Sequence, residues 1–109
     1  MTTPPSGTVT FLFTDIEGST KLAQANPATW RQMQERHHAI LRAAIEAHNG
    51  YVFQIIGDAF CASFSIAGGA LRAAIKAQID LHTEDWGDAP IKVRMGLHTG
   101  QVEIQASGD

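Results

Sequence analysis

The chain has 109 residues, of which 44% are hydrophobic and 17% charged, and a formal net charge of −3. This size suits one compact domain, and the mild acidity argues against nucleic acid as a partner. The single cysteine, Cys61, excludes an internal disulfide, and no apolar run approaches the roughly 18 residues of a membrane span. Residues 1–7 lack lysine and arginine, unlike a secretory signal, so we expect a flexible leader, a domain over 8–109 and a cytoplasmic location.

The first predicted strand runs from Val9 to a carboxylate, Asp15, and is rich in β-branched and aromatic residues. A small-residue turn, Gly18-Ser19-Thr20, follows it, and a helix is expected to start at Lys21. A carboxylate beside the free N–H groups of a helix start suits a metal-bound polyphosphate. This stretch alone leaves open that Asp15 is an ordinary turn or capping residue.

The next segment repeats apolar residues at intervals of three and four, which predicts a helix with one mainly apolar stripe. The stripe consists of Trp30, Met33, His37, Ile40, Leu41, Ala44, Ile45 and His48. Asn26 is expected to cap this helix, with Pro27 in its first position and Asn49-Gly50 at its end. His37 and His38 invite a metal interpretation. Because adjacent helical residues point to different faces and no other ligand has a useful spacing, they are interpreted as structural or exposed.

Two strand-like runs, Tyr51–Ile56 and Ala59–Phe64, are separated by Gly57-Asp58, which predicts a β-hairpin. Asp58 is then a second carboxylate at a strand end. If the hairpin lies beside the first strand, two carboxylates meet at one rim of the sheet. Such a pair can hold two divalent cations roughly 3.5–4 Å apart, as in-line attack on a phosphoryl group requires. The alternative is that Asp58 serves only the geometry of the turn.

A second helical stripe is expected to consist of Ala67, Ala70, Leu71, Ala74, Ile75 and Ile79. Residues 91–97 alternate apolar and polar side chains, which predicts a half-exposed strand. His98-Thr99-Gly100 is expected to turn the chain into a further short strand over 101–104, with His98 stabilising that turn.

The predicted order of strand, helix, strand, strand, helix and strand is an α+β, ferredoxin-like βαββαβ sandwich. It has a mainly antiparallel sheet with two helices on one face. This topology places the first strand and the second hairpin strand together at the centre of the sheet. Such a layout serves many unrelated functions, so function has to be argued from the site.

Three blocks of sequence resemble the class III adenylate/guanylate cyclase catalytic domain and stand in its order along the chain. They are Phe13-Thr14-Asp15-Ile16-Glu17-Gly18-Ser19-Thr20, Ile56-Gly57-Asp58-Ala59-Phe60-Cys61-Ala62-Ser63-Phe64 and Val93-Arg94-Met95-Gly96-Leu97-His98-Thr99-Gly100-Gln101-Val102-Glu103. The resemblance runs from Thr8 to Glu103 and covers only the first part of the family's domain.

The resemblance implies conversion of ATP or GTP to the 3′,5′-cyclic nucleotide and pyrophosphate in cyclic-nucleotide signalling. Two Mg²⁺ or Mn²⁺ ions would be held by Asp15 and Asp58, assisted by the backbone carbonyl of Ile16. The turn of Glu17, Gly18, Ser19 and Thr20 would bind the phosphates through backbone N–H groups. Gln54 stands at the purine-selecting position, and an amide that both donates and accepts does not decide between ATP and GTP.

One departure concerns an Asn-x-x-x-Arg pair that the family carries downstream and supplies across a dimer interface. Asn26 and Asn49 are followed four residues later by Trp30 and Phe53, so neither forms that motif. The resemblance thus implies a nucleoside triphosphate substrate, a homodimer or pairing with a second cyclase chain, and little or no activity alone. The alternative is a non-catalytic, cyclase-like binding or regulatory domain. An RNA-binding βαββαβ domain fits less well, because an aromatic-basic strand motif is absent.

Overall fold

The computed structural model describes residues 5–102; residues 1–4 and 103–109 lie outside its described part. The described helices and strands follow one another in the order β1 (Gly7–Ile16), α1 (Ser19–Ala25), α2 (Trp30–Ala47), β2 (Tyr51–Ile56), β3 (Ala59–Phe64), α3 (Ala67–Thr83) and β4 (Val93–Val102). β1 begins at Gly7, so the last residue of the predicted leader belongs to the sheet, and the first four residues lie outside the described part.

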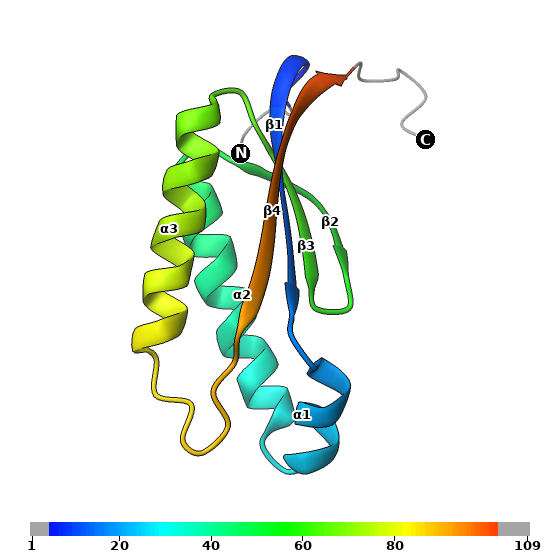
Figure 1. The fold of residues 1–109 in the computed structure, drawn as a ribbon, viewed down its shortest axis with the longest axis vertical. Coiled ribbons are helices and arrows are strands. Elements are labelled where there is room, and N and C mark those ends of the chain that lie inside the picture. The colour runs from blue at the N-terminus through cyan, green and yellow to red at the C-terminus, as the bar shows by residue number, and fades with distance from the viewer. Residues whose placement is uncertain (1–4, 103–109) are drawn as a thin grey trace.

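The strands form one antiparallel sheet in the order β2-β3-β1-β4. α2 and α3 pack side by side on one face of this sheet, and the short α1 lies beyond its lower end (Figure 1). The prediction of a ferredoxin-like α+β fold is confirmed, and β1 and β3 are neighbours at the centre of the sheet as expected. The carboxyl end of β1 and the β2–β3 turn consequently lie at the same end of the molecule.

The core lies between the sheet and the two long helices. Alternation along β1 turns Leu12 and Ile16 toward α2 and α3, where Leu41 and Ile45 of α2 meet them. Phe60 of β3 is fully buried in the same layer. The two-residue hairpin predicted at Gly57-Asp58 is present, with φ of 60° at Gly57, a conformation that glycine adopts without strain.

The buried face of α3 differs from the predicted stripe. The buried residues are Ala70, Ala73, Ala74, Ala77 and Leu81, whereas Leu71, Ile75 and Ile79 are each about half exposed. Small side chains allow α3 to lie close to α2 and the sheet, and this close packing decides the rotation of the helix. The prediction is confirmed for Ala70 and Ala74. It was wrong for the three larger side chains, because spacing alone does not distinguish an alanine face from a neighbouring face with larger side chains.

The boundary between the first two helices also differs from the prediction. Asn26 ends α1, and both its backbone N–H and its side-chain Nδ2 donate to the Leu22 carbonyl, at 3.0 and 2.9 Å. α2 begins only at Trp30, preceded by Thr29. The expected capping of the long helix by Asn26 was therefore wrong, because its side chain closes the preceding helix.

β4 does not turn at His98-Thr99-Gly100 but continues to Val102. It pairs with β1 along its whole length, and the hydroxyls of Thr10 and Thr99 are 2.9 Å apart across the pair. This long pairing overrides the turn preference of the sequence, so the predicted turn and the role of His98 in it were wrong. The predicted strand over 101–104 extends beyond the described residues.

Candidate metal and phosphate site

Asp15 lies at the carboxyl end of β1, directly opposite Arg94 of β4. Arg94 forms a bidentate salt bridge with it, in which Nε donates to Oδ1 at 3.0 Å and Nη2 donates to Oδ2 at 2.7 Å. The hydrogen bond and the charge of Asp15 raise the pKa of the Arg94 guanidinium above its ordinary value. Arg94 was not predicted as part of this site, because its position opposite Asp15 depends on the register of β1 and β4.

Asp58 occupies the second position of the two-residue turn between β2 and β3. Its Oδ1 accepts a hydrogen bond from the side-chain Nε2 of Gln34 on α2, at 2.9 Å. The carboxylate is therefore positioned by two elements: the β2–β3 turn, which places it at the end of the sheet, and α2, whose Gln34 hydrogen-bonds it. Asp58 is half buried, and Asp15 is likewise neither fully exposed nor fully buried.

Both carboxylates line one cavity of about 660 Å³ at the end of the sheet. The predicted site residues that line it are Asp15, Ile16, Gly18, Ser19, Thr20 and Asp58. Lys21 and Arg94 add two cationic side chains to the same lining. Segments forty residues apart in the sequence thus meet around one space, with oxygen ligands and cationic groups beside each other. Glu17 and Gln54 are not among the lining residues.

The turn before α1 presents only part of the predicted phosphate-binding backbone. Gly18 has a φ of 64° and immediately precedes the helix, whose first N–H groups have no partner within the helix itself. The N–H of Glu17, in contrast, donates to the Lys92 carbonyl at 2.8 Å. Of the predicted turn, Gly18, Ser19 and Thr20 line the cavity, and Glu17 does not.

A second hollow, of about 330 Å³, adjoins the first on the sheet face that α2 and α3 leave open. The two share Asp15, Ala59 and Arg94 in their linings. Cys61 lines the second hollow, and Gln54 is its register partner on β2. Gln54 is exposed on the open face, one strand beyond the hollow rather than in its wall.

The donor set of the first cavity fits a hard divalent cation. Two carboxylates and a backbone carbonyl are oxygen ligands, which Mg²⁺ and Mn²⁺ prefer. Asp15, Asp58 and the Ile16 carbonyl are the groups that would hold such ions. Arg94 is a competing cation at Asp15, because the same carboxylate oxygens serve both.

A second group of ligand atoms lies behind Asp58. One ligand atom each from His37, His38 and Asp58 lie within 4.8 Å of one another. From the sequence, both histidines were interpreted as structural or exposed because no further ligand has a useful spacing. That premise was wrong, since the hairpin brings Asp58 to the two rings, whose Nδ1 atoms lie 3.3 Å apart.

The imidazole of His37 is fully buried. Burial, and to a smaller extent the neighbouring His38, lower its pKa to about 4, while the charge of Asp58 acts in the opposite direction. His37 is consequently neutral at pH 7 and retains a ring nitrogen lone pair.

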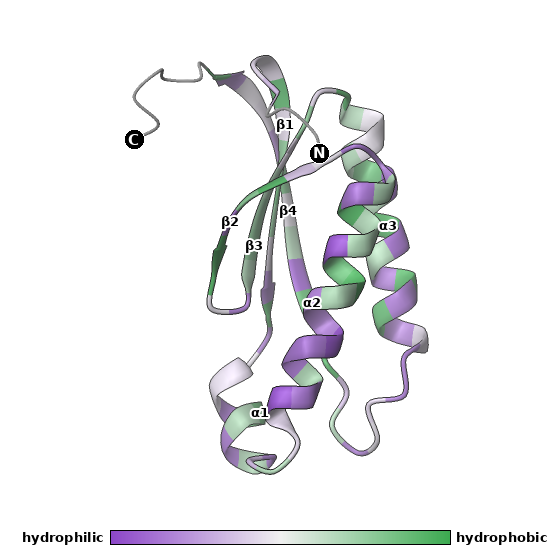
Figure 2. Ribbon diagram, turned by 180° about the vertical axis from the view of Figure 1, so that it is seen from behind, coloured by the Kyte–Doolittle hydropathy of each residue, from purple (hydrophilic) through white to green (hydrophobic). Residues whose placement is uncertain are grey.

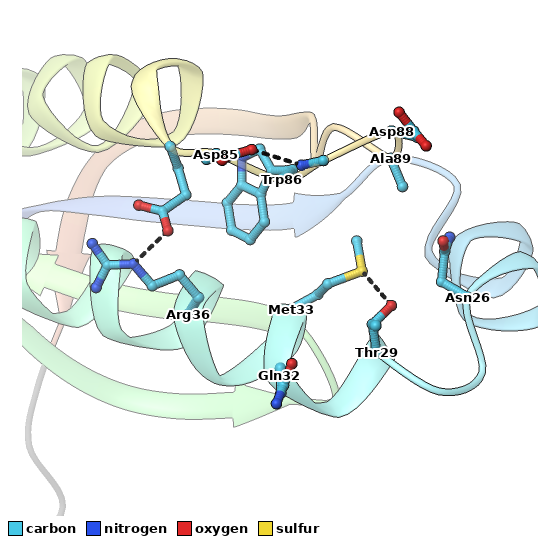
Figure 3. A pocket seen from close by; sticks show the side chains of 11 residues that line it. Asn26, Thr29, Gln32, Met33, Arg36, Asp85, Trp86, Asp88 and Ala89 are labelled. Carbon is cyan, nitrogen blue, oxygen red and sulfur yellow. Dashed lines mark hydrogen bonds and ion pairs between the residues drawn. The ribbon is translucent and has the colours of Figure 1, made fainter.

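A separate cavity of about 520 Å³ lies between the start of α2 and the loop that joins α3 to β4 (Figure 3). Several of its side chains already have hydrogen-bond partners within the protein. Arg36 Nε donates to Glu84 at 2.9 Å, the Trp86 indole N–H donates to the Leu81 carbonyl at 2.8 Å, and the Met33 sulfur accepts from Thr29. None of the predicted site residues lines this cavity, and we do not assign the candidate site to it.

None of the helices in the described part combines the length and the apolar character needed to traverse a lipid bilayer. The chain is thus a ferredoxin-like α+β domain with a carboxylate-lined cavity at one end of its sheet.

A family model described as the adenylate and guanylate cyclase catalytic domain matches residues 1–109. The chain therefore belongs to this family. It is 35% identical over 83 residues to an adenylate cyclase of Schizosaccharomyces pombe, which covers 76% of the chain and 5% of that protein. It is 38% identical over 104 residues to an uncharacterised protein of Mycobacterium tuberculosis, which covers 94% of the chain and 34% of that protein.

Solved structures of cyclases share the fold. An adenylate cyclase from Trypanosoma brucei, solved in its monomeric state, superposes with a TM-score of 0.84 at 24% identity, over 91% of this chain and 59% of that chain. The guanylate cyclase domain of a Catenaria anguillulae protein, in complex with GTP, gives 0.72 at 21% identity, over 86% and 57%. A dimeric guanylyl cyclase domain from Blastocladiella emersonii gives 0.76 at 20%, over 92% and 61%. The chain thus spans only part of each of these relatives.

Proposed function

We propose that this chain is the metal- and triphosphate-binding part of a class III nucleotidyl cyclase, which converts ATP or GTP to the 3′,5′-cyclic nucleotide and pyrophosphate. The observation that carries the proposal is the shared cavity of Asp15 and Asp58 beside the Gly18–Thr20 turn. Membership of the cyclase family and the similarity to adenylate cyclases support it.

In this proposal Asp15, Asp58 and the Ile16 carbonyl hold two divalent cations at the rim. When bound, Mg²⁺ or Mn²⁺ would supply charge that lowers the pKa of the ribose 3′-hydroxyl and offsets the charge of the triphosphate and of the leaving pyrophosphate. The backbone N–H groups of Gly18–Thr20 bind phosphate oxygens at the start of α1. The phosphates compete with Asp15 for the guanidinium of Arg94. When Arg94 binds a phosphate, Asp15 is free to bind a cation.

The base would lie over the open face of the sheet, in the hollow that adjoins the rim, with Gln54 at its far side. The amide of Gln54 donates and accepts, which suits the polar edge of either purine. This assignment leaves the choice between ATP and GTP to groups besides Gln54.

The open face also provides the surface for a second cyclase domain. Phe13 and Phe53 are each 44% exposed on this face, and Phe11 packs between them with ring centroids 5.9 Å from each. Exposed aromatic clusters of this kind are typical of protein interfaces. We infer that this face pairs with a second copy of the chain or with another cyclase chain.

A calorimetric titration with Mn²⁺ and nucleotide tests the metal site. Asp15→Ala and Asp58→Ala are each expected to reduce metal-dependent nucleotide affinity by at least about tenfold, because a lost charged ligand costs more than about 1.4 kcal/mol. Asp80→Ala is the matched control, since Asp80 pairs with Lys76 on the surface of α3, at 2.9 Å, and should bind as wild type. Unchanged affinity in both rim variants would show that the two carboxylates hold no catalytic metal.

A non-catalytic regulatory module is the second candidate. The observation that favours it is that both carboxylates have protein partners in this chain, Arg94 for Asp15 and Gln34 for Asp58. These contacts give each of the two carboxylates a hydrogen-bond partner in the absence of a cation. If the wild-type chain binds nucleotide no better with Mn²⁺ than with EDTA while it associates with a second cyclase domain, the regulatory function is the correct one.

A further inference from the structure

His38 is oriented as a metal-binding histidine usually is. Its Nδ1 lies 2.8 Å from the carbonyl oxygen of Gln34, one helical turn earlier. A carbonyl can only accept, so Nδ1 carries the proton and Nε2 keeps a lone pair. Metal-ligating histidines almost always donate their other ring N–H to a carbonyl or carboxylate in this way.

His37 contributes a buried polar group whose hydrogen-bonding capacity is not used. Within residues 5–102, its Nε2 is the one buried side-chain nitrogen or oxygen atom without a hydrogen-bond partner. The ring is 0% exposed and packs edge-on against Phe60, with centroids 5.8 Å apart. Because His38 Nδ1 carries a proton and lies 3.3 Å from Nδ1 of His37, the lone pair of the neutral His37 ring lies on Nδ1, on the side of the ring that faces His38.

Asp58 completes the set, and Gln34 positions two of the three groups. The Gln34 side chain donates to Asp58 Oδ1 at 2.9 Å, while its backbone carbonyl orients His38. Oδ2 of Asp58 is not used in that bond. One residue of α2 thus supports both half-buried ligands, which is how protein groups around a metal site fix its geometry.

We propose that His37, His38 and Asp58 form a second cation site, which binds Zn²⁺ or a similar nitrogen-seeking divalent ion. Two imidazoles and one carboxylate are a typical zinc ligand set, with a fourth position left for water. Zinc–ligand distances of 2.0–2.1 Å place tetrahedral ligand atoms about 3.3 Å apart. The present atoms lie within 4.8 Å, so binding draws the half-buried His38 and Asp58 toward the buried His37.

The site shares Asp58 with the rim cavity, so the two cation sites compete for one carboxylate. Zinc drawn to the histidines turns Asp58 away from Asp15, and an oxygen-seeking ion at the rim does the reverse. This competition rests on the proposed cyclase function. The zinc site itself does not.

The test is Zn²⁺ affinity, measured by competition with a chromophoric chelator on the folded chain, with Co²⁺ absorption as a spectroscopic readout of tetrahedral coordination. Wild type is expected to bind one ion, and His38→Gln is expected to bind it at least about tenfold more weakly. His48→Gln is the matched control. His48 is also half buried and directly follows the last residue of α2. Its Nδ1 lies 2.9 Å from the Ala44 carbonyl, but it is outside the cluster.

Asp15→Ala separates this proposal from the proposed function. It should lose metal-dependent nucleotide binding and keep full Zn²⁺ affinity, whereas Asp58→Ala should lose both. The zinc site is overturned if wild type shows no saturable binding, if His48→Gln weakens it as much as His38→Gln, or if Asp15→Ala weakens it. The last result would place zinc at the rim. Thermal melting of each variant confirms that a loss of binding is not a loss of folding.

Discussion

His37 makes the stability of the fold depend on pH. Its pKa is lowered from 6.5 to about 4 in the folded chain, so between these values the unfolded chain binds the extra proton. Stability therefore rises with pH across this window and is lost as pH falls from about 6.5 to about 4. His38 on α2 and Asp58 on the hairpin are the ionisable groups that face the ring. Urea unfolding between pH 4 and 7, with EDTA to remove cations, measures the effect.

The control for this prediction is His37→Leu, which removes the titrating group and fills the same core position. Its free energy of unfolding should change less over the window than that of wild type, by up to about 3 kcal/mol at about 1.4 kcal/mol per pKa unit. Equal pH slopes in the two proteins would show that His37 is not held neutral by the core.

At the residue scale, the sequence predicted the carboxylates but not their partners. Asp15 and Asp58 stand out because each follows an apolar strand at a turn. Arg94 lies beside Asp15 because of the sheet register, and Gln34 lies beside Asp58 because α2 packs against the hairpin. Neither arrangement can be predicted from a local sequence pattern. The His37–His38–Asp58 group was missed for the same reason. No third ligand lies near the two adjacent histidines in the sequence, and Asp58 of the hairpin comes close to them only in the folded chain.

The junction between α2 and β2 has no room for an added methyl group at Gly50. A Cβ at Gly50 would lie 2.5 Å from Phe64 Cε2 and 2.6 Å from Ile45 Cγ2, and both side chains are fully buried. Gly50→Ala is expected to lower the free energy of unfolding by about 1–3 kcal/mol, because neither neighbour has room to move. Gly96→Ala is the control, since nothing lies within 4 Å of its Cβ position. Urea unfolding should show less than about 0.5 kcal/mol of change there, and a similar loss in both variants would contradict the steric explanation.

Element boundaries and helix rotation were predicted less well than element type. The apolar period identified both long helices, but it placed Leu71, Ile75 and Ile79 of α3 inward where the structure buries alanines. The larger side chains give the stronger signal in a sequence. Close packing of α3 against α2 and the sheet favours the smaller ones (Figures 1 and 2). Local preference also predicted a turn within β4, where pairing with β1 keeps the strand continuous.

At the scale of the whole molecule, the topology followed from the order of elements alone. A βαββαβ chain with short connections has few ways to bury two helices on one antiparallel sheet, and this arrangement places the ends of β1 and the hairpin together. Function did not follow from the topology. It required the three sequence blocks and the cavity in which two of them meet.

Turnover by this chain alone is expected to be low. The solved cyclases extend beyond the region it covers, since it spans 59% of the Trypanosoma brucei chain. We expect the 109-residue chain to bind nucleotide with Mn²⁺ and to form little cyclic product, because loss of one transition-state donor typically costs ~10²–10³ in rate. Product formation from ATP and from GTP is measured over a series of protein concentrations, with Asp58→Ala as the blank. A specific activity that climbs steeply with concentration would contradict this expectation. It would mean that two copies, joined through the aromatic face around Phe13 and Phe53, assemble a complete site from the residues present.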